Sequence, residues 1–219
     1  MRSLKKVLAL MLSLAMVFSM LTVTAIADEI EWTEVGTTAE LKAAITAAEE
    51  GVTKYIKVTK RIGMTSTAYV TIPEKRDIVI DVNGHSLGLS NKTANLAPFT
   101  NNGTLTLQDS VGGGNVWGNS SGASAYPIIN NGTLTIKDGV AVARYSGTVV
   151  NTEEDISKIG SLYAATATKK ECIKNTGTLV IENATLCNGV TADGSITIQL
   201  GNFATDLSAN VEEGFKWEE

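Results

Sequence analysis

The sequence predicts an all-β protein whose parallel strands wind into a solenoid. A nine-residue stretch at 101–109 recurs closely at 130–138 and less closely at 175–183. Each copy alternates apolar residues with polar or β-branched ones, which is the pattern of a short, half-buried strand. The intervals between copies are too long for hairpins and too poor in helical periodicity for βαβ units. Stacked coils, each burying its inner face on the next, explain the repeat best.

The repeat has two sets of matched residues besides its apolar positions. Each glycine begins a strand, and an asparagine lies two residues before it. Asparagine tolerates left-handed backbone and bonds neighbouring backbone groups, so it is expected at a bend. Stacked coils would place equivalent side chains about 4.8 Å apart. The structural residues of the repeat are Asn101, Gly103, Asn130, Gly132, Asn175 and Gly177.

The two repeat intervals differ in length. Gly103 and Gly132 are 29 residues apart, whereas Gly132 and Gly177 are 45 apart, so the second interval holds either an insertion or an extra coil. Residues 151–171 break the repeat and are the best candidate for an inserted, projecting loop. Loops on a rigid scaffold often carry binding specificity.

Residues 1–27 have the pattern of a secretory signal peptide. A basic start precedes an uncharged apolar run from Val7 to Val23, and Ala25-Ile-Ala27 offers a cleavage site before Asp28. An uncleaved membrane anchor is the alternative, because the run approaches the minimum length of a span, about 17 residues. Cleavage predicts a secreted or cell-surface protein with no membrane insertion afterwards.

The remaining chain, 28–219, is expected to form a single domain, given its length. Removing residues 1–27 takes away three of the 18 basic residues and none of the 23 acidic ones, which leaves a net charge of −8. That charge disfavours nucleic acid and anionic membranes as partners. Cys172 and Cys187 occupy different positions in the repeat, so two core-facing thiols are favoured over a disulfide, although secretion permits one.

The N-terminal part of the domain begins with a predicted helix at 36–50. Thr37 and Glu40 form a capping box, apolar residues follow at helical spacing, and Gly51 ends the run. Such a helix would cap the open end of the solenoid. Strand-like runs follow at 55–59, 68–72, 77–82 and 86–89, with a tight turn at Asn83-Gly84. In the strand around 116–117, either Val116 or Trp117 is expected to point inward and the other outward.

Several of these segments together resemble right-handed parallel β-helix proteins of the pectin-lyase-like class, above all secreted and surface proteins of Gram-positive, Clostridia-type bacteria. The resemblance rests on the helix at 36–50, the Ile72-Pro73 strand end, the stretch 78–87 and the repeated Asn-Asn-Gly-Thr-Leu motif. The tail at 196–215 resembles the ending of such coils but departs from it at Leu200 and Asn210. The resemblance implies a right-handed, single-stranded β-helix and little about activity, because this fold hosts lyases, hydrolases, adhesins and spacers.

Four residues are candidates for catalysis if the chain is a polysaccharide lyase or glycoside hydrolase. Asp109 and Asp138 share a repeat position and could hold Ca²⁺ or act as an acid–base pair. Caps on nearby backbone groups are the favoured interpretation of both. His85 is the only histidine and Arg144 lies in no recognisable motif. The motifs by which the resemblance would imply an enzyme, such as Gly-His-Gly, are missing.

The aromatic residues suggest a weaker possibility, a platform on which sugars stack. The candidates are Trp117, Tyr126, Tyr145 and Tyr163, although aromatics in such a fold are more often packing residues. The sequence therefore favours a secreted or surface module without catalytic activity, adhesin-like or structural, which contacts polysaccharide or host and cell-wall glycans. The alternatives are the diverged lyase or hydrolase, with Ca²⁺ as its cofactor, and a fragment of a larger surface protein.

Overall fold

The computed structural model describes residues 30–64, 69–90, 97–119, 126–145, 172–186, 190–203 and 207–214. The chain divides into two compact units, Met1–Glu31 and Trp32–Glu219. All helices and strands described here belong to the second unit. The signal peptide predicted at 1–27 and the loop predicted at 151–171 lie outside the described residues, so both stay predictions.

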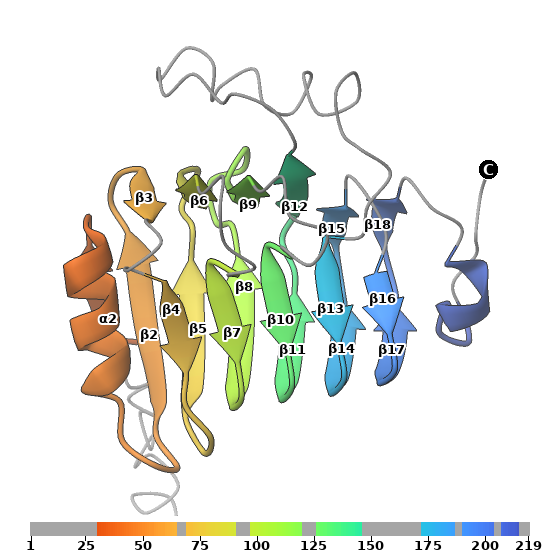
Figure 1. The fold of residues 1–219 in the computed structure, drawn as a ribbon, viewed down its shortest axis with the longest axis horizontal. Coiled ribbons are helices and arrows are strands. Elements are labelled where there is room, and N and C mark those ends of the chain that lie inside the picture. The colour runs from red at the N-terminus through yellow and green to blue at the C-terminus, as the bar shows by residue number, and fades with distance from the viewer. Residues whose placement is uncertain are drawn as a thin grey trace, which may run out of the picture. The chain divides into compact units, whose positions relative to one another are not determined.

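Parallel strands form three sheets in the described part of this unit (Figure 1). Sheet A has seven strands in the order β1 (Trp32–Val35), β2 (Thr53–Val58), β5 (Asp77–Asp81), β8 (Thr104–Gln108), β11 (Thr133–Ile136), β14 (Thr178–Ile181) and β17 (Ser195–Ile198). Sheet B has six, namely β3 (Ile62–Met64), β6 (Ser86–Ser90), β9 (Asn115–Asn119), β12 (Val140–Tyr145), β15 (Ala184–Leu186) and β18 (Gly201–Phe203). Sheet C has five, namely β4 (Val70–Ile72), β7 (Phe99–Asn101), β10 (Ile128–Asn130), β13 (Ile173–Asn175) and β16 (Val190–Ala192).

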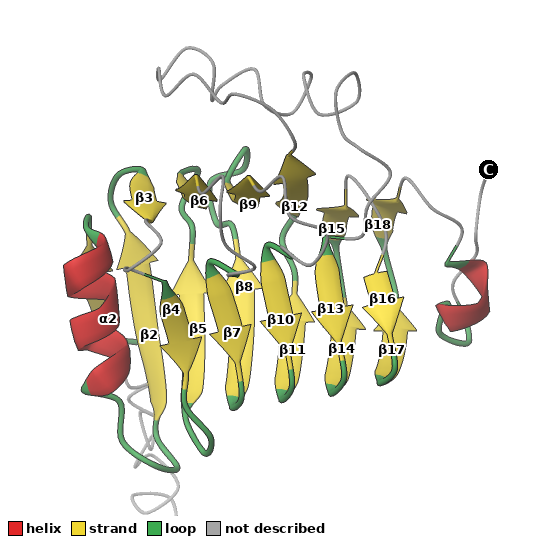
Figure 2. Cartoon of the chain, in the orientation of Figure 1, coloured by secondary structure: helices red, strands yellow, loops and turns green. Residues whose placement is uncertain are grey.

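Successive strands along the chain enter sheets C, A and B in turn, as β10, β11 and β12 do. The chain is therefore an all-β parallel solenoid, and this prediction is confirmed. Figure 2 shows the strands side by side along the solenoid, with a helix next to its first strands and the short 3₁₀-helix η1 (Ser208–Asn210) after its last ones.

The three turns that carry the repeat stack in register, as predicted. Leu134 pairs with Leu105 on one side and with Leu179 on the other, and all three are fully buried. Strand β11 pairs directly with β14, and β10 with β13, so an extra coil between the second and third copies is ruled out. The additional residues of that interval fall at 146–171, outside the described residues.

The inward side chains form one apolar core along the solenoid. It reaches from Val35 in β1 to Ile198 in β17 and includes the helix residues Leu41 and Ile45. Cys172 lies fully buried in this core, as predicted. Cys187 is outside the described residues, so the state of the pair stays untested.

The asparagines of the repeat do more than form a bend. Asn101 donates from Nδ2 to Asn130 Oδ1 at 2.7 Å, and Asn130 donates to Asn175 Oδ1 at the same distance. Each also donates to a backbone carbonyl of the following coil, at Thr133, Thr178 and Ser195 respectively. All three are 0% exposed. The asparagines therefore form a buried ladder that bonds one coil to the next at the corner between sheets C and A.

The predicted helix is shorter than 36–50. Helix α2 spans Thr38–Thr46, and Ala47 caps it in right-handed helical geometry. The turn at Ala47–Glu50 then leads to Gly51, whose φ of +77° suits glycine. Its buried residues are Leu41, Ala44 and Ile45. Ala48, the next apolar residue of the predicted face, is also buried in the core although it lies beyond the helix end.

The capping box at the start of α2 is confirmed. The Thr37 hydroxyl accepts a bond from the Glu40 N–H at 3.2 Å, and the Glu40 carboxylate accepts one from the Gly36 N–H at 2.7 Å. The Gly36 bond, followed by that of the Thr37 side chain, lowers the pKa of Glu40 below its ordinary value. A lowered pKa in the folded state means that the carboxylate stabilises the helix at neutral pH and loses this effect as acid protonates it.

Replacing Thr37 by alanine is expected to lower the free energy of unfolding by about 1 kcal/mol, because the cap would be lost. Urea denaturation followed by circular dichroism measures this change. Thr46→Ala is the matched control, since its hydroxyl only bonds back to the Lys42 carbonyl within the same helix. Equal losses for the two variants would contradict a special role for the cap.

Candidate functional site

The corner between sheets A and B holds the first group of sequence candidates. Asn83 and Gly84 adopt φ values of +51° and +77°, which confirms the predicted tight turn. The Asp81 carboxylate accepts bonds from the N–H groups of Asn83 and Ser110, at 2.8 and 3.0 Å. Carboxylates at this corner thus bond turns of the same coil and of the next one.

The Asp109 carboxylate likewise bonds backbone groups in the turns of two coils. Its two carboxylate oxygens accept the N–H groups of Gly84 and Gly114, at 2.7 and 2.6 Å, and the residue is 4% exposed. This agrees with the interpretation of Asp109 as a cap on backbone groups. A reacting sugar or a cation would have to displace these bonds to use the carboxylate.

Asp138 has a different environment, although it shares the repeat position of Asp109. It is exposed and lies in a short turn with a φ of +56°, followed by Gly139 at +79°. The turn from β8 to β9 is longer than the turn from β11 to β12, so the two carboxylates have different surroundings. The structure therefore does not give them equivalent positions along a ladder.

The two other catalytic candidates lie at separate places. His85 follows the Asn83-Gly84 turn and is half-buried, with its N–H bonded to the Val82 carbonyl at 2.8 Å. Arg144 belongs to β12, paired with Gly118 of β9, and its side chain is outside the described set. Within the described residues, no group of three or more His, Cys, Asp or Glu side chains is placed to hold a metal ion.

Trp117 is buried rather than available to a ligand. It is 1% exposed but lies outside the apolar core, whereas Val116 beside it is 0% exposed and belongs to that core, so one of the two points inward and the other outward, as expected. Gly88 pairs with Trp117 across sheet B, and a Cβ at Gly88 would lie 2.0 Å from the indole ring. The glycine of the preceding coil thus makes room for the ring. The indole N–H has no hydrogen-bond partner among the described residues.

The remaining aromatic candidates give no platform that can be described. Tyr126 is half-buried at the start of a coil, before Pro127. Tyr145 ends β12 and its side chain is outside the described set, as is the whole of Tyr163. The sugar-stacking role of these residues stays a prediction, and for Trp117 it does not fit the burial of the ring.

Two aromatic residues outside the candidate set come together on sheet A. Trp32 of β1 pairs with Tyr55 of β2, and their rings lie 5.3 Å apart at 67° in an edge-to-face arrangement. Both side chains are half-buried. They point away from the core, because consecutive strand residues face opposite sides and Ile56, next to Tyr55, is fully buried in the core. Neither belongs to the repeat, so the sequence signal was only the strand alternation around Tyr55.

The row that begins with Trp32 and Tyr55 continues along the outer face of sheet A. Paired positions in successive strands put like side chains side by side. This row is Trp32, Tyr55, Val79, Thr106, Thr135, Val180 and Thr197. A second row, two residues earlier in each strand, is Thr53, Asp77, Thr104, Thr133, Thr178 and Ser195. We call these thirteen residues the outer face.

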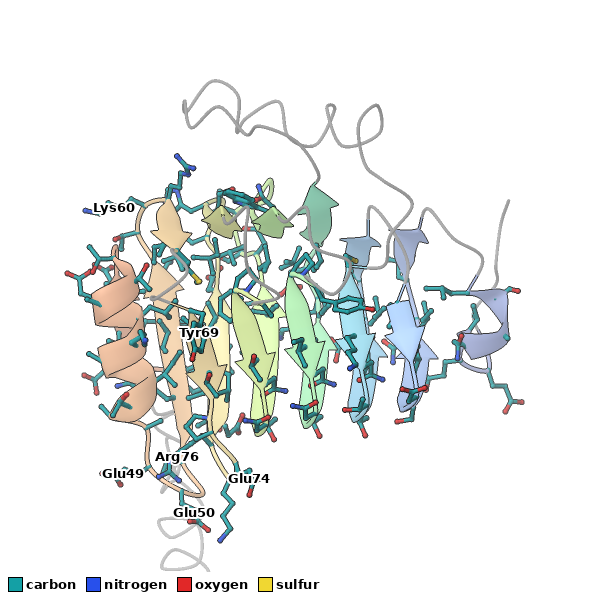
Figure 3. All side chains as sticks on the ribbon, viewed as in Figure 1. Glu49, Glu50, Lys60, Tyr69, Glu74 and Arg76 are labelled. Carbon is teal, nitrogen blue, oxygen red and sulfur yellow. The ribbon has the colours of Figure 1, made fainter. Side chains whose placement is uncertain are left out.

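A further groove lies between α2 and the edge strand β4. It encloses about 300 Å³ and is lined by Lys42, Ile45, Thr46, Tyr69, Val70, Thr71 and Pro73. Figure 3 shows Tyr69 beside α2, away from the charged turn that carries Glu74 and Arg76. The Lys42 ammonium lies 5.6 Å from the centre of the Tyr69 ring, so it covers a ring face that a sugar would need.

The fold and these sites define a parallel β-solenoid with a regular, largely polar outer face. No protein-family model matches the chain, and searches of curated proteins and of solved structures find no similar protein. In the part of the chain that the structure describes, none of the helices has the length and hydrophobicity needed to cross a bilayer.

Proposed function

We propose that the chain is a secreted or cell-surface module without catalytic activity, adhesin-like or structural, which contacts polysaccharide or host and cell-wall glycans. The observation that carries this proposal is the use of Asp109, whose two oxygens are occupied by backbone N–H groups of two turns. A carboxylate that holds coils together is poorly placed to act as an acid, a base or a Ca²⁺ ligand. The glycan part of the proposal is supported by the half-buried Trp32–Tyr55 pair.

The proposal also covers the handedness of the solenoid, its structural class and its bacterial origin. We propose right-handed winding and a pectin-lyase-like class, of Gram-positive, Clostridia-type origin, on the sequence features given above. Helix α2 then acts as the cap of the first coil, which is supported by the burial of Leu41, Ala44 and Ile45 against that end of the core. Signal cleavage before Asp28 would deliver the module outside the cell.

Incubating the purified chain with plant and host polysaccharides, with and without Ca²⁺, is expected to release no new chain ends while at least one glycan binds. Reducing-end assays and absorbance of unsaturated products measure cleavage, and affinity electrophoresis measures binding. Cleavage would overturn the proposal in favour of a lyase or hydrolase. In that case Asp138→Asn, His85→Ala and Arg144→Gln would show which side chain the reaction needs, and Asp109→Asn would be interpreted only alongside its stability.

A further inference from the structure

The outer face has a regularity that the core does not require. Within β8, β11, β14 and β17 its two rows hold six threonines, one serine and one valine. Neighbouring strands place equivalent side chains about 4.8 Å apart, and residues two apart in a strand are about 6.6 Å apart. The hydroxyl groups therefore form a two-dimensional lattice. Thr104, Thr178 and Ser195 are exposed and the others half-buried, as expected on the open side of a sheet.

The aromatic pair at one end of the outer face gives an independent indication of the ligand. Trp32 and Tyr55 start the row that Thr106 and Thr135 continue. An edge-to-face pair leaves ring surface for an apolar partner, and Tyr and Trp also carry a polar group. A sugar ring suits both parts of this row. Its C–H face packs on aromatic rings, and its hydroxyl groups exchange hydrogen bonds with threonine and serine.

The charge of the outer face selects among polysaccharides. In β8, β11, β14 and β17 the two rows contain no ionisable side chain, and the chain as a whole has a net charge of −5. Asp77 adds a negative charge near the aromatic end, where its carboxylate accepts a bond from Thr53 Oγ1 at 2.6 Å. The nearest cation on this side of sheet A is Lys57, two residues after Tyr55 in β2, where it pairs with Asp81. A polyuronate would find no cation in the two rows themselves, so a neutral polymer fits better.

From these observations we infer that the outer face binds a neutral polysaccharide chain lying along the solenoid axis, across the strands, with Tyr55 and Trp32 as its anchor. This inference rests on the proposed function and specifies its ligand class and binding surface. A chain in this direction meets an equivalent pair of hydroxyl groups at each coil. From β2 to β17 the track is about 24 Å long, five strand spacings.

Isothermal titration of the purified chain with cellohexaose, xylohexaose, mannohexaose and hexagalacturonate tests the inference. At least one neutral oligomer is expected to bind, to bind more tightly than its trimer, and to bind at least tenfold more tightly than hexagalacturonate. Tyr55→Ala should weaken that binding tenfold or more, and the double variant Thr106→Val/Thr135→Val should weaken it at least threefold. Valine keeps the β-branched shape, so circular dichroism of the double variant should be unchanged.

Thr71→Val/Thr100→Val is the matched control. These threonines pair on the outer side of sheet C, and the same change there should alter the affinity less than twofold. Glycan binding that survives the outer-face variants, or a preference for hexagalacturonate, would overturn the inference and leave the proposed function standing. Failure to bind any glycan would overturn both. Self-association abolished by Tyr55→Ala, without glycan binding, would assign the face to a second copy instead.

Discussion

Replacing Asn130 by alanine is expected to lower the free energy of unfolding by about 3 kcal/mol, because the change breaks the buried ladder in its middle. Asn130 accepts from Asn101 and donates to Asn175 Oδ1 and the Thr178 carbonyl, at 2.7 to 2.9 Å. Alanine cannot replace these bonds, and an unsatisfied buried polar group costs about 1–3 kcal/mol. Urea denaturation measured by circular dichroism and tryptophan fluorescence gives the loss.

Asn131→Ala is the control for this prediction. Asn131 is the adjacent residue, of the same type, and it also bonds its counterparts in neighbouring coils, at Asn102 and Thr176. Those bonds are exposed to water, so their loss should change stability by less than about 0.5 kcal/mol. If Asn130→Ala and Asn131→Ala cost the same, burial of the ladder does not govern its contribution.

The sequence predicts the position of the asparagine ladder but not its hydrogen bonds. Alternation in the repeat predicted the strands and their register, because period-two patterns and matched copies are local signals. Asparagine in a repeat also predicted a corner. The hydrogen bonds between the asparagine side chains depend on the distance between stacked coils. The sequence of one repeat does not reveal that distance.

The burial of Trp117 is a feature that the sequence does not predict, and the reason is non-local. Alternation implies that one of two consecutive strand residues faces out of the core, and Trp117 does lie on the side opposite Val116. It is nevertheless buried, because Gly88 in the preceding coil leaves space for the indole. The glycine lies 29 residues earlier in the sequence, and only the strand pairing shows that the two residues are neighbours.

The candidate site was predictable to a smaller extent than the fold. Asp109 was correctly weighed as a structural residue, since an acid at a strand end commonly caps a turn. Asp138 shares its repeat position but is exposed, and the turns that follow the two residues differ in length. The sequence does not predict the Trp32–Tyr55 pair, because neither residue belongs to the repeat and they meet only through the pairing of β1 with β2.

Stacking of the coils also arranges the outward side chains in a regular order. A buried ladder fixes the register of each coil, and the register then places outward side chains in straight rows. The outer face is a consequence of that register, so a variant that disturbs coil stacking would disturb any ligand bound across several coils. Binding and stability should therefore be measured together in variants of the corner residues.

Replacing Gly132 by alanine is expected to destabilise the fold by about 3 kcal/mol, near the upper end of the usual cost of overpacking. A Cβ at this position would lie 2.0 Å from the Gly103 carbonyl oxygen and 2.8 Å from the Asn102 carbonyl carbon. Both atoms are backbone, so no side chain can turn aside to make room. The same close approach recurs at Gly177, 2.1 Å from the Gly132 carbonyl oxygen. Glycine is needed here for coil spacing rather than for a left-handed conformation.

Gly63→Ala provides the control for Gly132→Ala, because a Cβ there would meet nothing within 4 Å. With no clash, alanine should leave stability unchanged or raise it by about 0.5 kcal/mol through the less flexible unfolded chain. Thermal and urea denaturation of both variants measure the difference. Gly132→Ala with wild-type stability would mean that the coils can separate at this corner at little cost. The close approach of Gly103, Gly132 and Gly177 would then not set the spacing that aligns the hydroxyl rows of the outer face.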